Sequence, residues 1–315
     1  MTNSDSIVGD KDSAYDLTVI IPCTPDDTTI QEVLQPLSEQ EGLNFEVLLV
    51  MNPKSAPPPA FPSMKLRGLR ILSCDRGANR ARNKGLAESR SELVLFLDAD
   101  CCVPHSRFLF GLVQRMKNHP TLTAAGGAYH IPESSGPGEK AYNTLQLRWL
   151  HRGLFNSDFE TRHLLGGFLL IRKSYLKGYE FDEKLIFGGT ERELLRRLHQ
   201  DGHAIRLWPD LSVTHLGPIT PRGLAKKAFS QGQGARYILE KLGPELPAPQ
   251  KFIATQKPTP AEDPWIQLYQ FFFEWGFTGN PLKPVHRLVV NSVDSMFQWL
   301  RLTENRLRSY QAKNH

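Results

Sequence analysis

Residues 93–100 read Leu93-Val94-Leu95-Phe96-Leu97-Asp98-Ala99-Asp100: an apolar run that leads directly into two carboxylates separated by one alanine. A short, unbroken apolar run is typical of a strand that is buried on both faces of a sheet. Two acidic side chains directly after such a strand can reach one divalent cation together through hard oxygen ligands. By itself the triplet is weak evidence, because acidic residues are common where a strand meets a loop.

Apolar runs and helical patterns alternate on both sides of this segment. Strands are expected at Leu17–Ile21, Phe45–Val50 and Leu69–Leu72, and helices from Asp27 as N-cap to Leu37, at Asn79–Arg90 and at His105–Lys117. The alternation predicts an α/β fold with a doubly wound, mostly parallel sheet. Ligands of such sheets bind beyond the carboxyl ends of the strands, and that edge carries Pro22, Thr24, Asn52 and the two aspartates.

The second half of the chain continues with strands and longer helices. Strands are expected at Leu122–Tyr129, Gly167–Arg172, His203–Trp208 and Ser212–Leu216, and helices at Lys140–His151, Thr190–Gln200 and Arg222–Lys241. Thr190 and Glu193 have the spacing of a capping box, which gives Glu193 a structural role. Glu191 lies in the same first turn, where it is either stabilised by the helix dipole or serves as a general base.

Composition shifts divide the chain into four parts. We predict a disordered N-terminal segment at 1–16, a catalytic domain at 17–243, a proline-rich linker at 244–264 and a helical C-terminal extension at 265–315. Apolar residues recur at helical spacing from Val285 to Leu300. We expect this stripe to pack on the catalytic domain, the alternative being contact with a partner protein or the inner face of a membrane through the basic Arg301–Lys313 tail.

Bulk composition is that of a globular protein of 315 residues, with 40% hydrophobic residues and a formal net charge of +5. A charge this small suits phosphate-bearing substrates and is too diffuse to indicate nucleic acid as a partner. The four cysteines lack zinc-ligand spacing, which predicts reduced thiols and a cytoplasmic protein. The polar start predicts no signal peptide, and no run approaches the roughly 20 apolar residues of a membrane span.

Two further features carry chemistry. Arg76–Gly85 places glycine, several cations and two asparagines at a helix start, where backbone N–H groups and the dipole favour an anion. An exposed basic helix is the alternative, which is less suited to the closely spaced Arg80 and Arg82. His215 ends a strand-like run, and a lone histidine is more often structural than a metal ligand.

Together these pieces resemble the family-2 glycosyltransferases with the GT-A fold, whose nucleotide-binding half is Rossmann-like. The resemblance rests on ordered motifs across Leu17–Lys241: Val19-Ile20-Ile21-Pro22, Phe45-Glu46-Val47-Leu48-Leu49-Val50 with Asn52, Ala81-Arg82-Asn83-Lys84-Gly85, Phe96-Leu97-Asp98-Ala99-Asp100, Phe181-Asp182-Glu183 and Phe187–Leu194. Several motifs in family order are far more specific than any one of them.

The resemblance implies a role for each matching position. Asp98 and Asp100 correspond to the DxD motif, which binds a divalent metal (Mn²⁺ or Mg²⁺) and the sugar nucleotide. Pro22 and Thr24 would line the nucleotide, and Arg82 would face the nucleotide or its diphosphate. Further positions are Glu191 as the catalytic base of inverting members and His215 as an additional metal or diphosphate contact.

Two positions depart from the family pattern. Met51-Asn52 replaces a common Asp-Asp pair, although Asn52 can still hydrogen-bond a base edge. Thr190-Glu191 replaces the family's Glu-Asp pair, so the first acid is missing and the base is one methylene longer. The second change leaves weakened or altered activity open.

The sequence therefore predicts a metal-dependent, inverting hexosyltransferase. A nucleotide-sugar donor would pass its sugar to a hydroxyl of a glycan, a lipid-linked acceptor or a small molecule. One alternative is a catalytically silent module on the same fold that binds nucleotide or sugar. Another is a sugar nucleotidyltransferase, against which the absence of glycine from Pro22–Asp27 counts.

Overall fold

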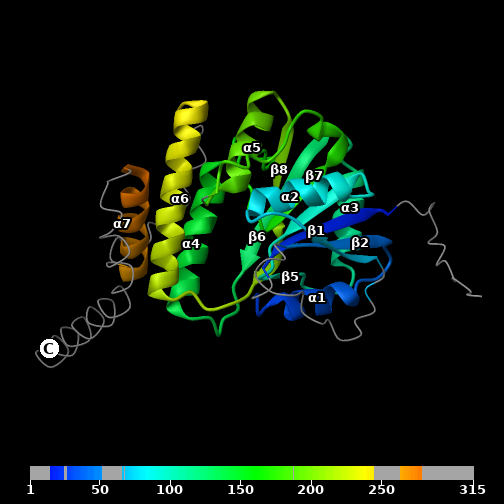
Figure 1. The fold of residues 1–315 in the computed structure, drawn as a ribbon, viewed down its shortest axis with the longest axis horizontal. Coiled ribbons are helices and arrows are strands. Elements are labelled where there is room, and N and C mark those ends of the chain that lie inside the picture. Colours follow the sequence, from blue (N-terminus) through cyan, green and yellow to red (C-terminus); the bar gives the residue numbers. More distant parts are fainter. Residues whose placement is uncertain are drawn as a thin grey trace, which may run out of the picture.

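The computed structural model describes residues 15–24, 27–51, 66, 68–186, 188–244 and 263–278. Its centre is an eight-stranded sheet with the strand order β3-β2-β1-β4-β7-β6-β8-β5 (Figure 1). The strands are β1 (Leu17–Cys23), β2 (Phe45–Met51), β3 (Leu69–Ser73), β4 (Leu93–Leu97), β5 (Cys101–Cys102), β6 (Leu122–His130), β7 (Phe168–Arg172) and β8 (Ala204–His215). The helices are α1 (Ile30–Ser38), α2 (Ala78–Glu88), α3 (Phe108–Lys117), α4 (Pro137–Arg152), α5 (Thr190–Gln200), α6 (Pro221–Leu242) and α7 (Pro264–Thr278), and η1 (Lys173–Leu176) is a 3₁₀ turn.

Parallel pairing dominates the sheet. In the run β3-β2-β1-β4 each strand is parallel to the next, and β6 is parallel to β8. The strand β7 runs antiparallel to both β4 and β6, and the short β5 runs antiparallel to β8. The predicted fold class, an α/β protein with a mostly parallel sheet, is confirmed.

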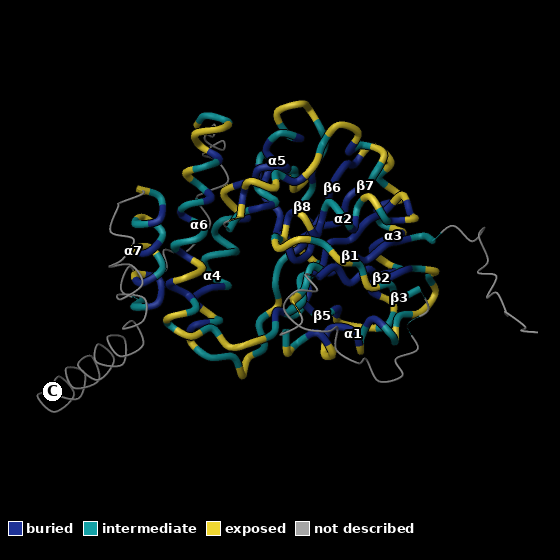
Figure 2. The backbone as a smooth tube through the Cα atoms, viewed as in Figure 1, coloured by how far each residue is buried: buried dark blue, intermediate teal, exposed yellow. Residues whose placement is uncertain are grey.

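Helices cover both faces of the sheet because alternate residues of its strands are apolar on both sides. Val19 and Ile21 of β1 pack in one core with α1 and α3, whereas Ile20 packs on the other face with α2 and α5. Burial is concentrated in these strands and in the helix faces turned toward them (Figure 2).

A third apolar cluster joins α4, α6 and α7, which stand side by side at one end of the molecule (Figure 1). Trp265 and Phe272 of α7 belong to this cluster together with Leu224 and Ala228 of α6. In the described residues, no helix has the length and apolar character needed to cross a membrane. The stripe from Val285 to Leu300 and most of the predicted 244–264 linker lie outside the described residues, as does most of the predicted N-terminal segment.

Several local predictions need correction. One continuous strand, β8, replaces the two expected at His203–Trp208 and Ser212–Leu216. The capping box is wrong: Gly189 is the N-cap of α5, because the Thr190 hydroxyl and the Glu193 carboxylate are both engaged by basic side chains from elsewhere in the fold. The Asp27 cap of α1 is also wrong, since its carboxylate accepts from the Thr24 N–H at 2.6 Å.

Candidate active site

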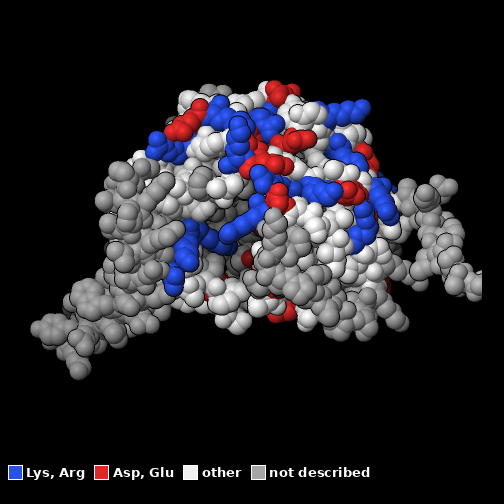
Figure 3. Space-filling view, in the orientation of Figure 1, with Lys and Arg blue, Asp and Glu red and all other residues white. Residues whose placement is uncertain are grey.

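A cavity of about 540 Å³ opens at the carboxyl ends of β1 and β4. Asp98 and Asp100 lie on its floor, Pro22 lies at the end of β1, and His215 closes the side formed by β8. Figure 3 shows the hollow in this face, with an acidic side chain at its bottom and Lys and Arg side chains along its rim. Four of the predicted site residues, which come from three separate motifs, therefore share one cavity.

The strand pair β5–β8 brings His215 to the aspartates. Cys101 is opposite His215 in the antiparallel register, and the Leu216 N–H donates to the Asp100 carbonyl at 2.7 Å. This backbone pairing places His215 Nε2 at 3.4 Å from Asp100 Oδ2. The two-residue β5 was not predicted, because Cys101-Cys102 is too short to give a periodic signal.

Burial sets the protonation of this pair. Burial raises the pKa of Asp100, and the charge of Asp98 raises it further, while His215 opposes the shift. Burial lowers the pKa of His215, although Asp100 acts in the other direction. The imidazole is therefore neutral near pH 7 and keeps a lone pair, which is the form that binds metals.

These side chains fit a divalent cation in their donor chemistry. Two carboxylates and a neutral imidazole suit Mn²⁺ or Mg²⁺, and both aspartate side chains are more than a third exposed toward the cavity. His215 Nδ1 is buried without a hydrogen-bond partner. Among the described residues, however, no three His, Cys, Asp or Glu side chains are already gathered at ligand spacing, so the metal remains a prediction.

Arg82 of α2 connects the floor of the cavity to the start of α5. One guanidinium nitrogen lies 3.1 Å from Asp98 Oδ1, and the other donates to Thr190 Oγ1 at 2.6 Å. The Thr190 hydroxyl in turn lies 3.3 Å from Glu191 Oε2. Arg82 is only 4% exposed and holds Asp98 from behind rather than lining the cavity.

Glu191 sits half-buried at the N-terminus of α5. Burial raises the pKa of its carboxyl group, Arg82 lowers it and Asp98 raises it. A raised pKa brings a carboxylate closer to the proton affinity that a general base needs at neutral pH. The geometry thus provides a candidate base that Thr190 and Arg82 connect to Asp98, although Glu191 is not among the described residues that line the cavity.

Gly166 and Gly167, just before β7, allow these groups to approach the backbone. A Cβ atom on Gly166 would lie 2.7 Å from Glu191 Oε2, and one on Gly167 would lie 2.7 Å from Asp98 Oδ2. Sequence analysis missed this pair, although two glycines directly before a buried strand are a signal for close backbone approach.

Other site predictions fare differently. Thr24 is exposed and is not among the described residues that line the cavity, while Asn52 lies outside the described residues. Sequence analysis also missed Lys227 of α6, which lines the cavity, and Tyr142 of α4, whose ring lies beneath the Lys227 ammonium. No local sequence motif marks either residue, because they come together only through the packing of α4 beside α6.

Residues 18–179 match the profile described as Glycosyl transferase family 2. The chain belongs to this family. The prediction of a nucleotide-sugar-dependent glycosyltransferase is thereby confirmed at the level of the family. A comparison with curated protein sequences returns no match.

Solved structures confirm the GT-A fold of this family-2 member. A mannosyltransferase from Pyrobaculum calidifontis, in complex with GDP-Man and Mn²⁺, superposes with a TM-score of 0.55 at 18% identity, covering 96% of this chain and 82% of that one. TarS from S. aureus gives 0.50 at 17% identity over 73% of this chain, which spans only 40% of the TarS chain. A mycobacterial protein gives 0.50 at 20% identity, covering 73% and 76% of the two chains.

Proposed function

We propose that this family-2 member is a metal-dependent, inverting glycosyltransferase that moves a hexose from a nucleotide donor to a hydroxyl acceptor. One observation carries the proposal: Asp98, Asp100 and His215 line one cavity, and Arg82 ties Asp98 to the helix that presents Glu191. Arg82 would thereby link the proposed metal site to the proposed base. The Mn²⁺ in the complex of the Pyrobaculum mannosyltransferase supports the choice of cation.

Each side chain has a defined task in this scheme. Glu191 accepts the proton of the acceptor hydroxyl as its oxygen attacks the anomeric carbon from the face opposite the leaving group. Asp98, Asp100 and His215 would hold the divalent cation, which as a Lewis acid offsets charge on the departing nucleoside diphosphate. Arg82 fixes the Asp98 carboxylate in place, so that little reorganisation is needed during transfer.

The Thr190 substitution leaves the base intact. Arg82 donates to the Thr190 hydroxyl, so the position of the family's missing acid is filled by a neutral group. Glu191 therefore lacks an acidic neighbour within its own motif, and its raised pKa comes chiefly from burial. This arrangement favours an active enzyme over a silent binding module.

Donor hydrolysis and transfer, measured over UDP-, GDP- and dTDP-sugars with Mn²⁺ and a panel of hydroxyl acceptors, test the proposal. We expect Asp100→Asn to lower kcat/KM by about 10²–10³, and the product to have the inverted anomeric configuration by NMR. If the protein binds nucleotide but transfers no sugar to any acceptor, the proposed enzyme is refuted and the silent binding module is favoured. Retention of configuration would refute Glu191 as an inverting base.

The four cysteines are free thiols, which supports a reducing compartment such as the cytoplasm. Contact of the chain beyond α7 with a membrane or a partner protein stays a prediction. Co-sedimentation of the full chain with anionic liposomes, compared with a variant that lacks 301–315, tests it.

A further inference from the structure

The cavity contains one lysine that the mechanism above does not use. Among the described residues that line the cavity, Lys227 is the only Lys or Arg, whereas Asp27, Asp98 and Asp100 contribute carboxylates. A diphosphate entering this cavity would meet more negative than positive charge from the protein. A permanent cation on the wall therefore has a large electrostatic effect on which ligand can bind.

Lys227 reaches the cavity from the second turn of α6. Gly223, one turn earlier, lines the same wall, so this face of the helix is turned toward the aspartates. The ammonium lies 4.7 Å from the centre of the Tyr142 ring. No hydrogen bond or ion pair of Lys227 is present among the described residues, which leaves its N–H donors available to a ligand.

The Tyr142 ring beneath Lys227 is buried and has its own hydrogen-bond partner. Tyr142 is 7% exposed, and its hydroxyl lies 3.4 Å from Gln231 Nε2. Gln231 also accepts a short hydrogen bond from Tyr269 of α7. A cation over a ring is held less strongly than one hydrogen-bonded to a phosphate, so Lys227 can leave the ring when an anion arrives.

We propose that the Lys227 ammonium binds the diphosphate of the donor. This contact makes the site selective for nucleoside diphosphates over nucleoside monophosphates. The inference rests on the proposed function and assigns it one more catalytic residue. As the bond between the anomeric carbon and the β-phosphate oxygen breaks, its electron pair stays on that oxygen. Lys227 donates a hydrogen bond to this oxygen, while the acceptor proton goes to Glu191.

Lys227 keeps its proton throughout this step. Tyr142 is the largest influence and raises the pKa of Lys227; burial opposes it, and Asp100 and Asp98 raise it further. The ammonium therefore acts as a fixed charge rather than as a general acid.

Isothermal titration of UDP and GDP, and of UMP and GMP, with the full-length protein in Mn²⁺ tests the assignment. Lys227→Gln should weaken binding of the better diphosphate about 10–100-fold, as expected for a lost charge-assisted hydrogen bond, and weaken the matched monophosphate by less than about 3-fold. Lys227→Arg should restore most of the preference for the diphosphate over the monophosphate. Lys226→Gln is the matched control, because this neighbouring lysine is not among the described residues that line the cavity.

Equal loss for diphosphate and monophosphate, or no loss for either, would overturn the role of Lys227 even if sugar transfer is observed. Conversely, a diphosphate-selective loss in a protein that transfers no sugar would sustain Lys227 while refuting the proposed enzyme. A wild-type protein that binds neither class of nucleotide would refute both. Thermal unfolding of each variant, measured alongside, separates lost affinity from lost fold.

Discussion

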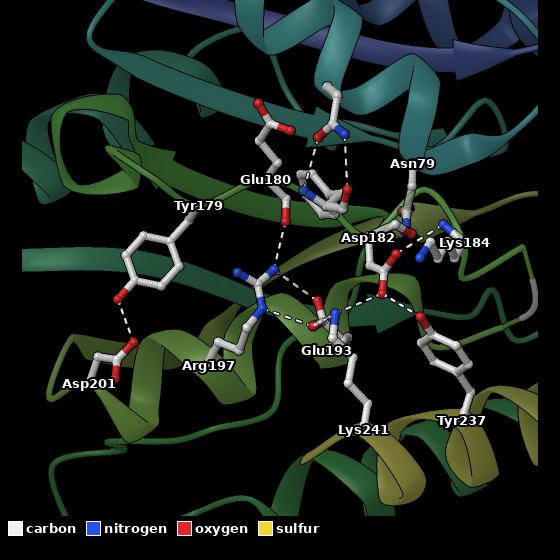
Figure 4. A network of polar contacts seen from close by, with 12 residues as sticks. Asn79, Tyr179, Glu180, Asp182, Lys184, Glu193, Arg197, Asp201, Tyr237 and Lys241 are labelled. Atoms are coloured by element: carbon white, nitrogen blue, oxygen red, sulfur yellow. Dashed lines mark hydrogen bonds and ion pairs between the residues drawn. The ribbon is translucent and has the colours of Figure 1, made fainter.

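Two glutamates on α5, separated by one residue, lie in opposite surroundings. Glu191 is connected through Thr190 and Arg82 to Asp98, and the neutral Thr190 hydroxyl lies 3.3 Å from its carboxylate. Glu193 is fully buried and accepts from Arg197 at 2.8 and 2.9 Å and from Lys241 at 2.7 Å (Figure 4). Positions two apart on a helix point about 200° away from each other, so one helix start can serve both regions.

The charged side chains around Glu193 all have partners of opposite charge, unlike those at the cavity. Lys241 also reaches Asp182 at 2.7 Å, and the Tyr237 hydroxyl donates to the same carboxylate at 2.7 Å (Figure 4). These contacts join α5, α6 and the loop before α5. By contrast, Asp100 in the cavity and Glu191 on the start of α5 have raised pKa values, and Lys227 has no anionic partner among the residues that the structure describes. Incomplete charge pairing marks the region that a substrate is expected to complete.

The sharpest test of this contrast is Glu191→Gln. We expect kcat to fall by about 10²–10⁴, because the acceptor proton loses its base. Stability should hardly change, since burial already disfavours the charged form of Glu191 and an amide has nearly the same shape. Initial rates and thermal unfolding of the same preparation measure both.

The pH dependence of kcat adds an independent check on Glu191. Its raised pKa predicts that activity is lost on acidification at a pH above the ordinary value of 4.5 for a glutamate. A wild-type acid limb at or below that value, or a Gln variant with the parent rate, would place the base elsewhere.

The converse substitution, Glu193→Gln, should act on stability instead. Removing the charge of the buried Glu193 leaves Arg197 without a carboxylate partner and Lys241 with Asp182 alone, which costs about 3 kcal/mol. In a domain of this size that corresponds to a fall in Tm of roughly 6–12 °C. The kcat of the folded protein should stay within about 2-fold of the parent, and a loss comparable to that of Glu191→Gln would erase the distinction between the two glutamates.

Sequence patterns predicted what depends on neighbours along the chain. The strand Leu93–Leu97 and the carboxylates after it are local features, and both are placed as expected. The partner of Glu193 was assigned wrongly, because a capping box uses only residues within one turn, whereas Lys241 arrives from another helix. Lys227 was missed for the same reason: only the packing of α6 beside α4 brings it to the cavity that contains Asp100.

A smaller effect is expected at Asp182. Burial would raise its pKa, but hydrogen bonds from Lys241 and Tyr237 outweigh it and lower the pKa from 3.8 to about 2. The stabilisation, about 2 kcal/mol, is therefore present above about pH 4 and lost as the pH falls toward about 2. Urea unfolding of wild type and Asp182→Asn should differ by that amount at neutral pH and converge in this acid window. If the difference in the free energy of unfolding between the two proteins stays constant down to the lowest pH, the Asp182 carboxylate is not the source of the stabilisation.

The smallest expected effect separates the two donors on Asp182. Tyr237→Phe removes one hydrogen bond and keeps the ring, so we expect a loss of about 1 kcal/mol in the free energy of unfolding. Because Lys241 still contacts Asp182, the acid transition should shift only part of the way toward the ordinary aspartate value. Sugar transfer should be unaffected, since Tyr237 lies on the paired side of α6 and Lys227 is more than two turns away. A marked change in kcat from this one hydroxyl would show that the paired network also positions the catalytic wall, and that the two regions are coupled through α6.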